Sequence, residues 1–154
     1  DYTVFKEALT DTFNKFFHSV PEYRDEETAN IEQTSRGISA VIGIIGRYGG
    51  RMILDMSTET TMAIARKLFK IEQPTKEHII NVIGEISNII AGNACSMMNK
   101  SNPLFGLRVA PPTIVYGESI KISKSELNTV TSVKADTSFG EIYMNIGFNR
   151  GECE

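Results

Sequence analysis

The chain has 154 residues, of which 41% are hydrophobic, and a formal net charge of -3 at pH 7. This composition favours a folded globular protein and argues against a disordered segment or a non-specific nucleic-acid binder. The length suits one domain, which we expect to span residues 1–154. The sequence contains no apolar run of membrane-spanning length, and we expect no signal peptide. We therefore expect a cytoplasmic protein that neither inserts into a membrane nor binds nucleic acid.

Residues 3–19 predict an amphipathic helix, because their apolar side chains recur at helical spacing. Pro21 limits this helix, since the residue before a proline disfavours helical geometry. The predicted apolar stripe consists of Val4, Ala8, Leu9, Thr12, Phe13, Phe16 and Phe17. Residues 23–35 are polar and acidic, so we expect an exposed connector with a short strand near Ile31.

Residues 35–57 predict a β-hairpin, because two segments rich in β-branched and apolar residues flank a turn at residues 48–51. The glycines of this hairpin do not indicate a phosphate-binding loop, which requires a helix directly after it. The following helix is expected over residues 58–69, with Ser57 or Thr58 at its start.

Residues 75–100 predict a long helix that buries one face. Pro74 and Thr75 suit its start, and Pro103 lies beyond its end. The buried stripe is expected to contain Ile79, Ile83, Ile86, Ile90, Ala94 and Met97.

The opposite face of this helix carries Asn81, Glu85, Asn88 and Gly92, with Gly84 and Cys95 beside them. A solvated face normally carries long charged side chains, and each interior glycine costs about 1 kcal/mol relative to alanine. Two interpretations of the glycines stay open. Either a partner approaches the helix backbone closely, or the glycines pack against another element of the same domain.

The C-terminal third predicts further strands. After a turn-rich loop at residues 101–106, we expect a strand at residues 113–117, extended by residues 120–122. A second hairpin is expected from residues 129–135 and 140–148. Residues 50–56 resemble residues 140–146, which indicates an internal repeat of helix and hairpin. The predicted fold is α+β, with two long helices packed on an antiparallel sheet.

A motif on the long helix resembles a known family. Glu85-Ile86-Ser87-Asn88, followed after twenty-two residues by Pro111, is similar to the ExxN-x22-P signature of the CheC/CheX/FliY chemotaxis phosphatases. The stretch EISNIIAGNA and the order of helices and hairpins extend the resemblance over most of the chain. One such motif in a chain of this length is closer to CheX than to CheC, which usually carries two. The resemblance implies a CheC-like fold.

The resemblance implies a phosphatase that acts on the aspartyl phosphate of a CheY-like receiver domain. The receiver supplies the Mg²⁺ ion, and this chain binds no cofactor or metal of its own. Glu85 and Asn88 are the expected catalytic residues. Asn88 orients the attacking water, as an amide can both accept and donate hydrogen bonds, and Glu85 pairs with a lysine of the receiver. CheX-like proteins also form homodimers by joining their sheets, which we expect here.

Three further residues are expected to contact the receiver, and one proline to be structural. Gly84 and Gly92 keep the helix surface low, so that the cleft of the receiver can close over it. Asn81 stands where the family often has Asp or Ser, a departure that affects the details of this contact. Pro111, with Pro112, is expected to stiffen the entry to a strand and to brace the helix.

The internal repeat suggests where a second site would lie, but the residues do not support one. Asp11 stands where the motif has glutamate, and Asn14 is followed after twenty-two residues by Gly37 instead of proline. Since aspartate reaches less far than glutamate, we assign no second site.

Two other functions stay open at this stage. The chain can be a non-catalytic module that binds a receiver or a component of the flagellar switch. It can also be a hydrolase with Cys95 as nucleophile, although only His18 and His78 are available as a base. Cys95 and Cys153 form no metal or redox motif, and we expect both to be free thiols.

Overall fold

The computed structural model describes residues 2–26, 32–123 and 129–149. Its helices are α1 (Thr3–Phe17), α2 (Thr58–Phe69) and α3 (Lys76–Ser101), with a short 3-10 helix, η1 (Pro103–Phe105), after α3. Its strands are β1 (Glu22–Glu26), β2 (Glu32–Ile45), β3 (Gly50–Met56), β4 (Arg108–Val109), β5 (Thr113–Ser123), β6 (Thr129–Thr137) and β7 (Gly140–Phe148). None of the described helices is both long enough and apolar enough to cross a membrane.

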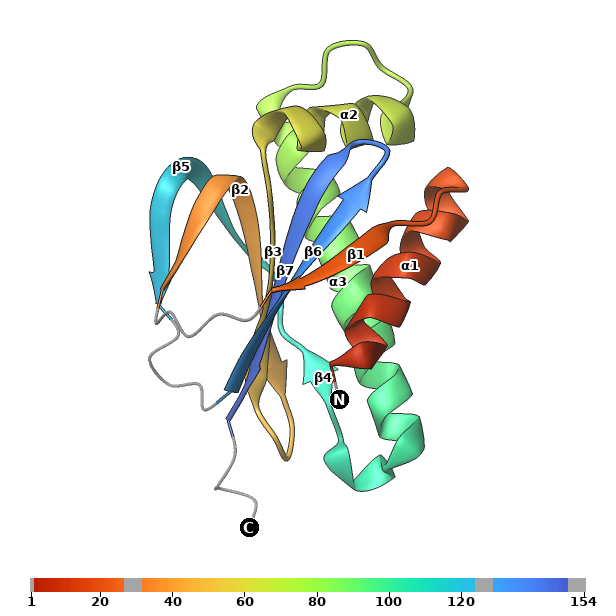
Figure 1. The fold of residues 1–154 in the computed structure, drawn as a ribbon, viewed down its shortest axis with the longest axis vertical. Helices are drawn as coiled ribbons and strands as arrows, with labels where there is room; N and C mark the ends of the chain where they lie inside the picture. Colours follow the sequence, from red (N-terminus) through yellow and green to blue (C-terminus); the bar gives the residue numbers. More distant parts are fainter. Residues whose placement is uncertain (1, 27–31, 124–128, 150–154) are drawn as a thin grey trace.

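The described strands form one seven-stranded antiparallel sheet in the order β1-β6-β7-β3-β2-β4, and β5 also pairs with β2. α1 and α3 lie side by side against this sheet, and α2 lies across one end of it (Figure 1). The core between the layers is apolar because successive side chains of a strand point to opposite faces of the sheet, and those facing the helices are apolar. For example, Ile38, Ala40 and Ile42 of β2 are fully buried beneath the helices. The structure therefore confirms the α+β class, the two long helices on the sheet and the shorter helix predicted over residues 58–69, which is α2.

The internal repeat has a structural counterpart at the centre of the sheet. Matching residues 50–56 with residues 140–146 places Leu54 on Met144. β3 and β7 are neighbours, and their antiparallel register pairs Leu54 directly with Met144. Two equivalent residues paired with each other are what a local twofold axis between the repeats produces. The two hairpins of the sequence therefore meet at their equivalent strands.

The expectation for residues 23–35 is wrong over β1, which pairs along its length with β6 at the edge of the sheet. Its sequence, EYRDE, lacks apolar alternation, because an edge strand with polar side chains needs no buried face. The strand predicted near Ile31 lies outside the described residues. β4, which pairs with the end of β2, was also not predicted, because two residues leave no periodicity.

Candidate functional site

α3 begins where the sequence predicts, because Thr75 caps its free amides. The Thr75 hydroxyl accepts a hydrogen bond from the His78 backbone N–H at 3.2 Å, and His78 Nδ1 accepts one from the Thr75 N–H at 3.0 Å. This reciprocal pair satisfies two donors that a helix start leaves free. Apolar residues from Ile79 to Ala94 then fix one face of the helix against the core.

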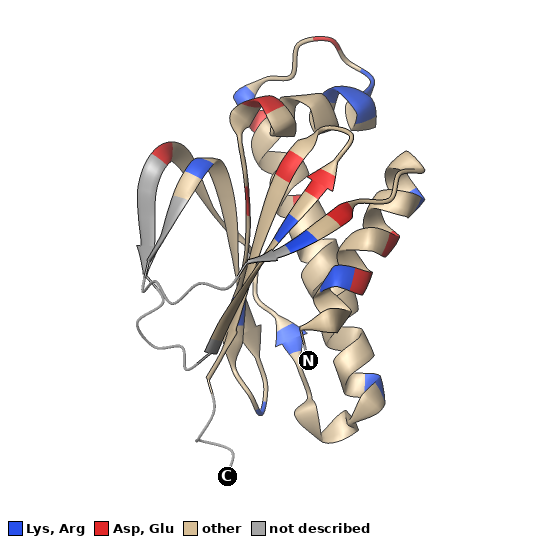
Figure 2. Ribbon diagram, viewed as in Figure 1, with Lys and Arg blue, Asp and Glu red and all other residues tan. Residues whose placement is uncertain are grey.

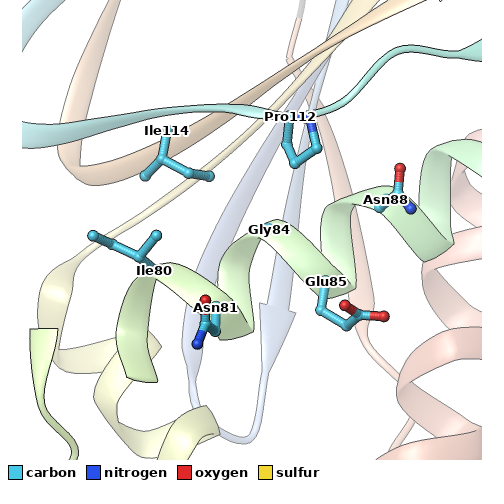
Figure 3. Close-up of a pocket in the computed structure, with 7 residues that line it drawn as sticks. All are labelled: Ile80, Asn81, Gly84, Glu85, Asn88, Pro112 and Ile114. Atoms are coloured by element: carbon cyan, nitrogen blue, oxygen red, sulfur yellow. The ribbon is translucent and has the colours of Figure 1, made fainter. Parts of the chain in front are cut away.

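The predicted functional residues lie on the solvent side of α3. Asn81, Glu85 and Asn88 are exposed, and residues three or four apart on a helix project from one face. With Ile80, Gly84, Pro112 and Ile114, they line a hollow of about 270 Å³ between α3 and the start of β5 (Figure 3). The structure thus brings four of the predicted site residues together around one hollow, namely Asn81, Gly84, Glu85 and Asn88. Gly92 lies one turn beyond Asn88 and does not line the hollow.

The polar side chains of the hollow have no partners within the described part of the chain. Glu85 and Asn88 form no side-chain hydrogen bond or ion pair with another described residue. Among the described residues, Asn88 therefore bonds to no neighbouring loop and Glu85 pairs with no lysine or arginine, so neither side chain has a purely structural role that the contacts show. An amide and a carboxylate one turn apart are left available to a molecule that docks on α3.

The far wall of the hollow was not identified from the sequence. The Pro112 ring lies over Gly84, and Ile114 faces Ile80 (Figure 3). Pro111, the proline of the signature, is exposed and is not part of the lining. The sequence analysis expected Pro111, with Pro112, to brace the helix, and the fold shows that Pro112 is the one that lies against Gly84.

The two glycines of α3 have different surroundings. A Cβ atom at Gly84 would meet Pro112 Cγ at 3.7 Å and Ile114 Cδ1 at 3.8 Å, which is ordinary contact distance. A Cβ atom at Gly92 would meet nothing within 4 Å. A Cβ atom would therefore fit at both glycines, so packing against the described residues requires glycine at neither position.

The sequence analysis placed Cys95 beside the exposed polar face of α3, and the structure shows that this is wrong. Its side chain is buried, and burial raises the pKa of the thiol from 9.0 to about 11. The thiol is therefore protonated at neutral pH and inaccessible to a substrate. A hydrolase that uses Cys95 as its nucleophile is inconsistent with this environment.

The charge around the hollow is sparse. Glu85 is the one charged residue among those that line it, and α3 carries no charged side chain between Glu85 and Lys100 (Figure 2). Across residues 2–26, 32–123 and 129–149, no group of three or more His, Cys, Asp or Glu side chains is placed to hold a metal ion. The arrangement offers hydrogen bonds and one carboxylate on an otherwise neutral ridge.

Comparison with known families connects this geometry to an activity. The family model of the chemotaxis phosphatase CheX matches residues 38–135, which include α3, Glu85, Asn88 and Pro111. The chain belongs to the CheX family. No curated protein matches the sequence.

Solved structures of CheX-like proteins share the fold. A chemotaxis protein CheX from Desulfovibrio desulfuricans is 20% identical with a TM-score of 0.83, covering 96% of this chain and 98% of the other. The CheX–CheY complex from Borrelia burgdorferi, solved with beryllium trifluoride and Mg²⁺, is 25% identical with a TM-score of 0.78, covering 97% and 99%. FliY from Thermotoga maritima has the same fold at 13% identity, with a TM-score of 0.60 and coverage of 95% and 85%.

Proposed function

We propose that this CheX-family chain hydrolyses the aspartyl phosphate of a CheY-like receiver domain, with Glu85 and Asn88 as its catalytic residues. One observation carries the proposal: these two side chains are exposed, one turn apart and bonded to no other described residue, on the motif that the family model covers. The CheX–CheY complex from Borrelia burgdorferi supports the choice of partner, since that CheX binds a CheY with beryllium trifluoride and Mg²⁺.

In the proposed reaction, a water molecule attacks the phosphorus in line with the bond to the aspartate oxygen. The new P–O bond forms as the old one breaks, and the products are a free aspartate carboxylate and inorganic phosphate, with a proton released to solvent. Asn88 Oδ1 accepts a hydrogen bond from the attacking water, while Nδ2 donates one to the phosphoryl group or the water. Positioning of this kind is the main protein contribution to phosphoryl transfer.

Glu85 has a different role in the proposal. Its carboxylate meets the active-site lysine of the receiver and so fixes the orientation of the docked partner. When bound to the receiver, Mg²⁺ neutralises charge on the phosphoryl oxygens. The hollow contains a single carboxylate, so we assign the metal to the receiver and not to this chain.

Phosphate release from a phosphorylated receiver tests these roles. We expect Asn88→Ala to lower kcat about a hundredfold, because it removes a group that acts in the transition state. We expect Glu85→Ala to raise KM about tenfold, because it removes a charged contact to the partner. Glu72→Ala, an exposed glutamate outside α3, is the control and keeps wild-type kinetics.

Two outcomes would overturn the proposal in different ways. Full activity of folded Asn88→Ala would exclude its role in positioning water. Binding of the phosphorylated receiver by the wild-type chain without faster phosphate release would instead identify a non-catalytic receiver-binding or flagellar-switch module.

A further inference from the structure

A second hollow lies on the other side of α3, between this helix and α1. It has a volume of about 200 Å³ and is lined by Asp11, Thr12, Lys15 and Phe16 of α1 and by Ile89 and Asn93 of α3. Ile89 directly follows Asn88, so the catalytic residues stand on a ridge between the two hollows. Figure 1 shows α1 and α3 side by side along this stretch.

The second hollow has side chains suited to binding another protein. Phe16, expected in the core, is 38% exposed. Lys15 Nζ lies 5.8 Å from the centre of its ring. Asp11 and Lys15 form no ion pair with another described residue. Aromatic residues are enriched in protein interfaces, and charges at the edge of an interface steer the encounter and favour the correct partner.

The size of a docked receiver domain also indicates that it contacts α1. Packed helices have axes about 8 to 10 Å apart. A domain of about 100 to 150 residues has a radius of gyration of about 13 to 15 Å and is roughly 35 Å across. A receiver centred on Glu85 and Asn88 therefore extends past α3 and over α1. A stable interface also takes about 20 to 30 residues from each partner, and the first hollow is lined by seven.

We propose that the hollow between α1 and α3 is the second contact for the same receiver and contributes to the choice of receiver. This inference rests on the proposed function. The receiver presents an apolar side chain to Phe16 and Ile89, next to a carboxylate that meets Lys15. Asp11 then belongs to one interface with Glu85 and Asn88, and a receiver on α3 excludes a second receiver on α1.

Binding and turnover by two α1 variants test the inference. The partner is whichever purified CheY-like receiver the wild-type chain dephosphorylates fastest. Calorimetry uses this receiver loaded with Mg²⁺ and beryllium trifluoride, and kinetics use its phosphorylated form. We expect Lys15→Glu and Phe16→Ala each to weaken binding and raise KM about five- to tenfold, with kcat unchanged.

Lys67→Glu is the matched control, because it makes the same charge change at an exposed position on α2, outside both hollows, and keeps wild-type affinity. Thermal melting of each variant separates lost binding from lost folding. Because the Lys15 side chain is solvent-exposed, we expect Lys15→Glu to fold normally, so it still tests the inference if Phe16→Ala is destabilised.

The outcomes distinguish this inference from the proposed function. If one receiver is dephosphorylated and both α1 variants bind it as tightly as wild type, the inference is wrong and the proposed function stands. If none of the purified CheY-like receivers that are tried is bound or dephosphorylated, the proposed function fails, and this inference fails with it. A lower kcat with unchanged affinity would also contradict a docking role for the second hollow.

Discussion

Gly92 allows stability and activity to be separated at one position. It lies in the interior of α3, where glycine is about 0.8 to 1 kcal/mol less favourable than alanine. The added Cβ atom would meet nothing within 4 Å. We therefore expect Gly92→Ala to raise the free energy of unfolding by about 0.8 kcal/mol and Tm by about 2 to 4 °C.

A larger side chain at Gly92 should lower activity without lowering stability. Gly92 lies one turn after Asn88, so a leucine would raise the surface beneath the docked receiver. We expect Gly92→Leu to fold with at least wild-type stability but to lower kcat/KM at least tenfold, measured as phosphate release. Lys67→Leu on α2 is the control for a new exposed leucine on a helix, and it keeps wild-type kcat/KM.

Two results would refute this reasoning. A lower Tm for Gly92→Ala would show that the glycine is required for packing within the domain. An unchanged kcat/KM for Gly92→Leu would show that the receiver does not approach this part of the helix.

Three further predictions concern the fold. A Cβ atom at Gly50 would overlap the Gly147 carbonyl oxygen, so Gly50→Ala should lower the free energy of unfolding by about 1 to 3 kcal/mol in urea titrations. Buried Asp55 accepts hydrogen bonds from Arg36 Nη1 at 2.8 Å and the Ser39 hydroxyl at 2.6 Å. Asp55→Ala should therefore cost about 3 to 5 kcal/mol, and a loss below 1 kcal/mol would contradict its role. Since burial raises the pKa of Cys95 from 9.0 to about 11, the unfolded state loses this proton first, and stability should fall between those pH values. A Cys95→Ala variant should lack that part of the pH dependence.

The sequence predicted α3 and its exposed polar residues because helical periodicity is strong over such a length. It misplaced Cys95, since a helical projection treats the whole helix alike. In the structure, the segment after α3 folds back along its C-terminal half. Asn99 fixes this segment by accepting a hydrogen bond from the Leu107 N–H and donating one to the Leu107 carbonyl oxygen, each at 2.8 Å. Contacts of this kind leave no periodic signal in a sequence.

The far wall of the hollow between α3 and β5, and the hollow between α1 and α3, were also not predicted from the sequence. Pro112 reaches Gly84 only because β5 pairs with β2 and so passes near α3. Phe16 was expected in the core, since its spacing matches the apolar stripe of α1, but it lines the hollow between α1 and α3 and is 38% exposed. The homodimer stays a prediction. β1 at one side of the sheet and β5 at the other are outer strands that could join two copies.

The most direct test of the central claim is the rate of phosphate release from a phosphorylated CheY-like receiver with wild-type chain, Glu85→Ala and Asn88→Ala. The account predicts acceleration by the wild-type chain, a loss of kcat for Asn88→Ala, and weaker receiver binding for Glu85→Ala. Equal acceleration by all three folded proteins would contradict the assignment of catalysis to this face of α3.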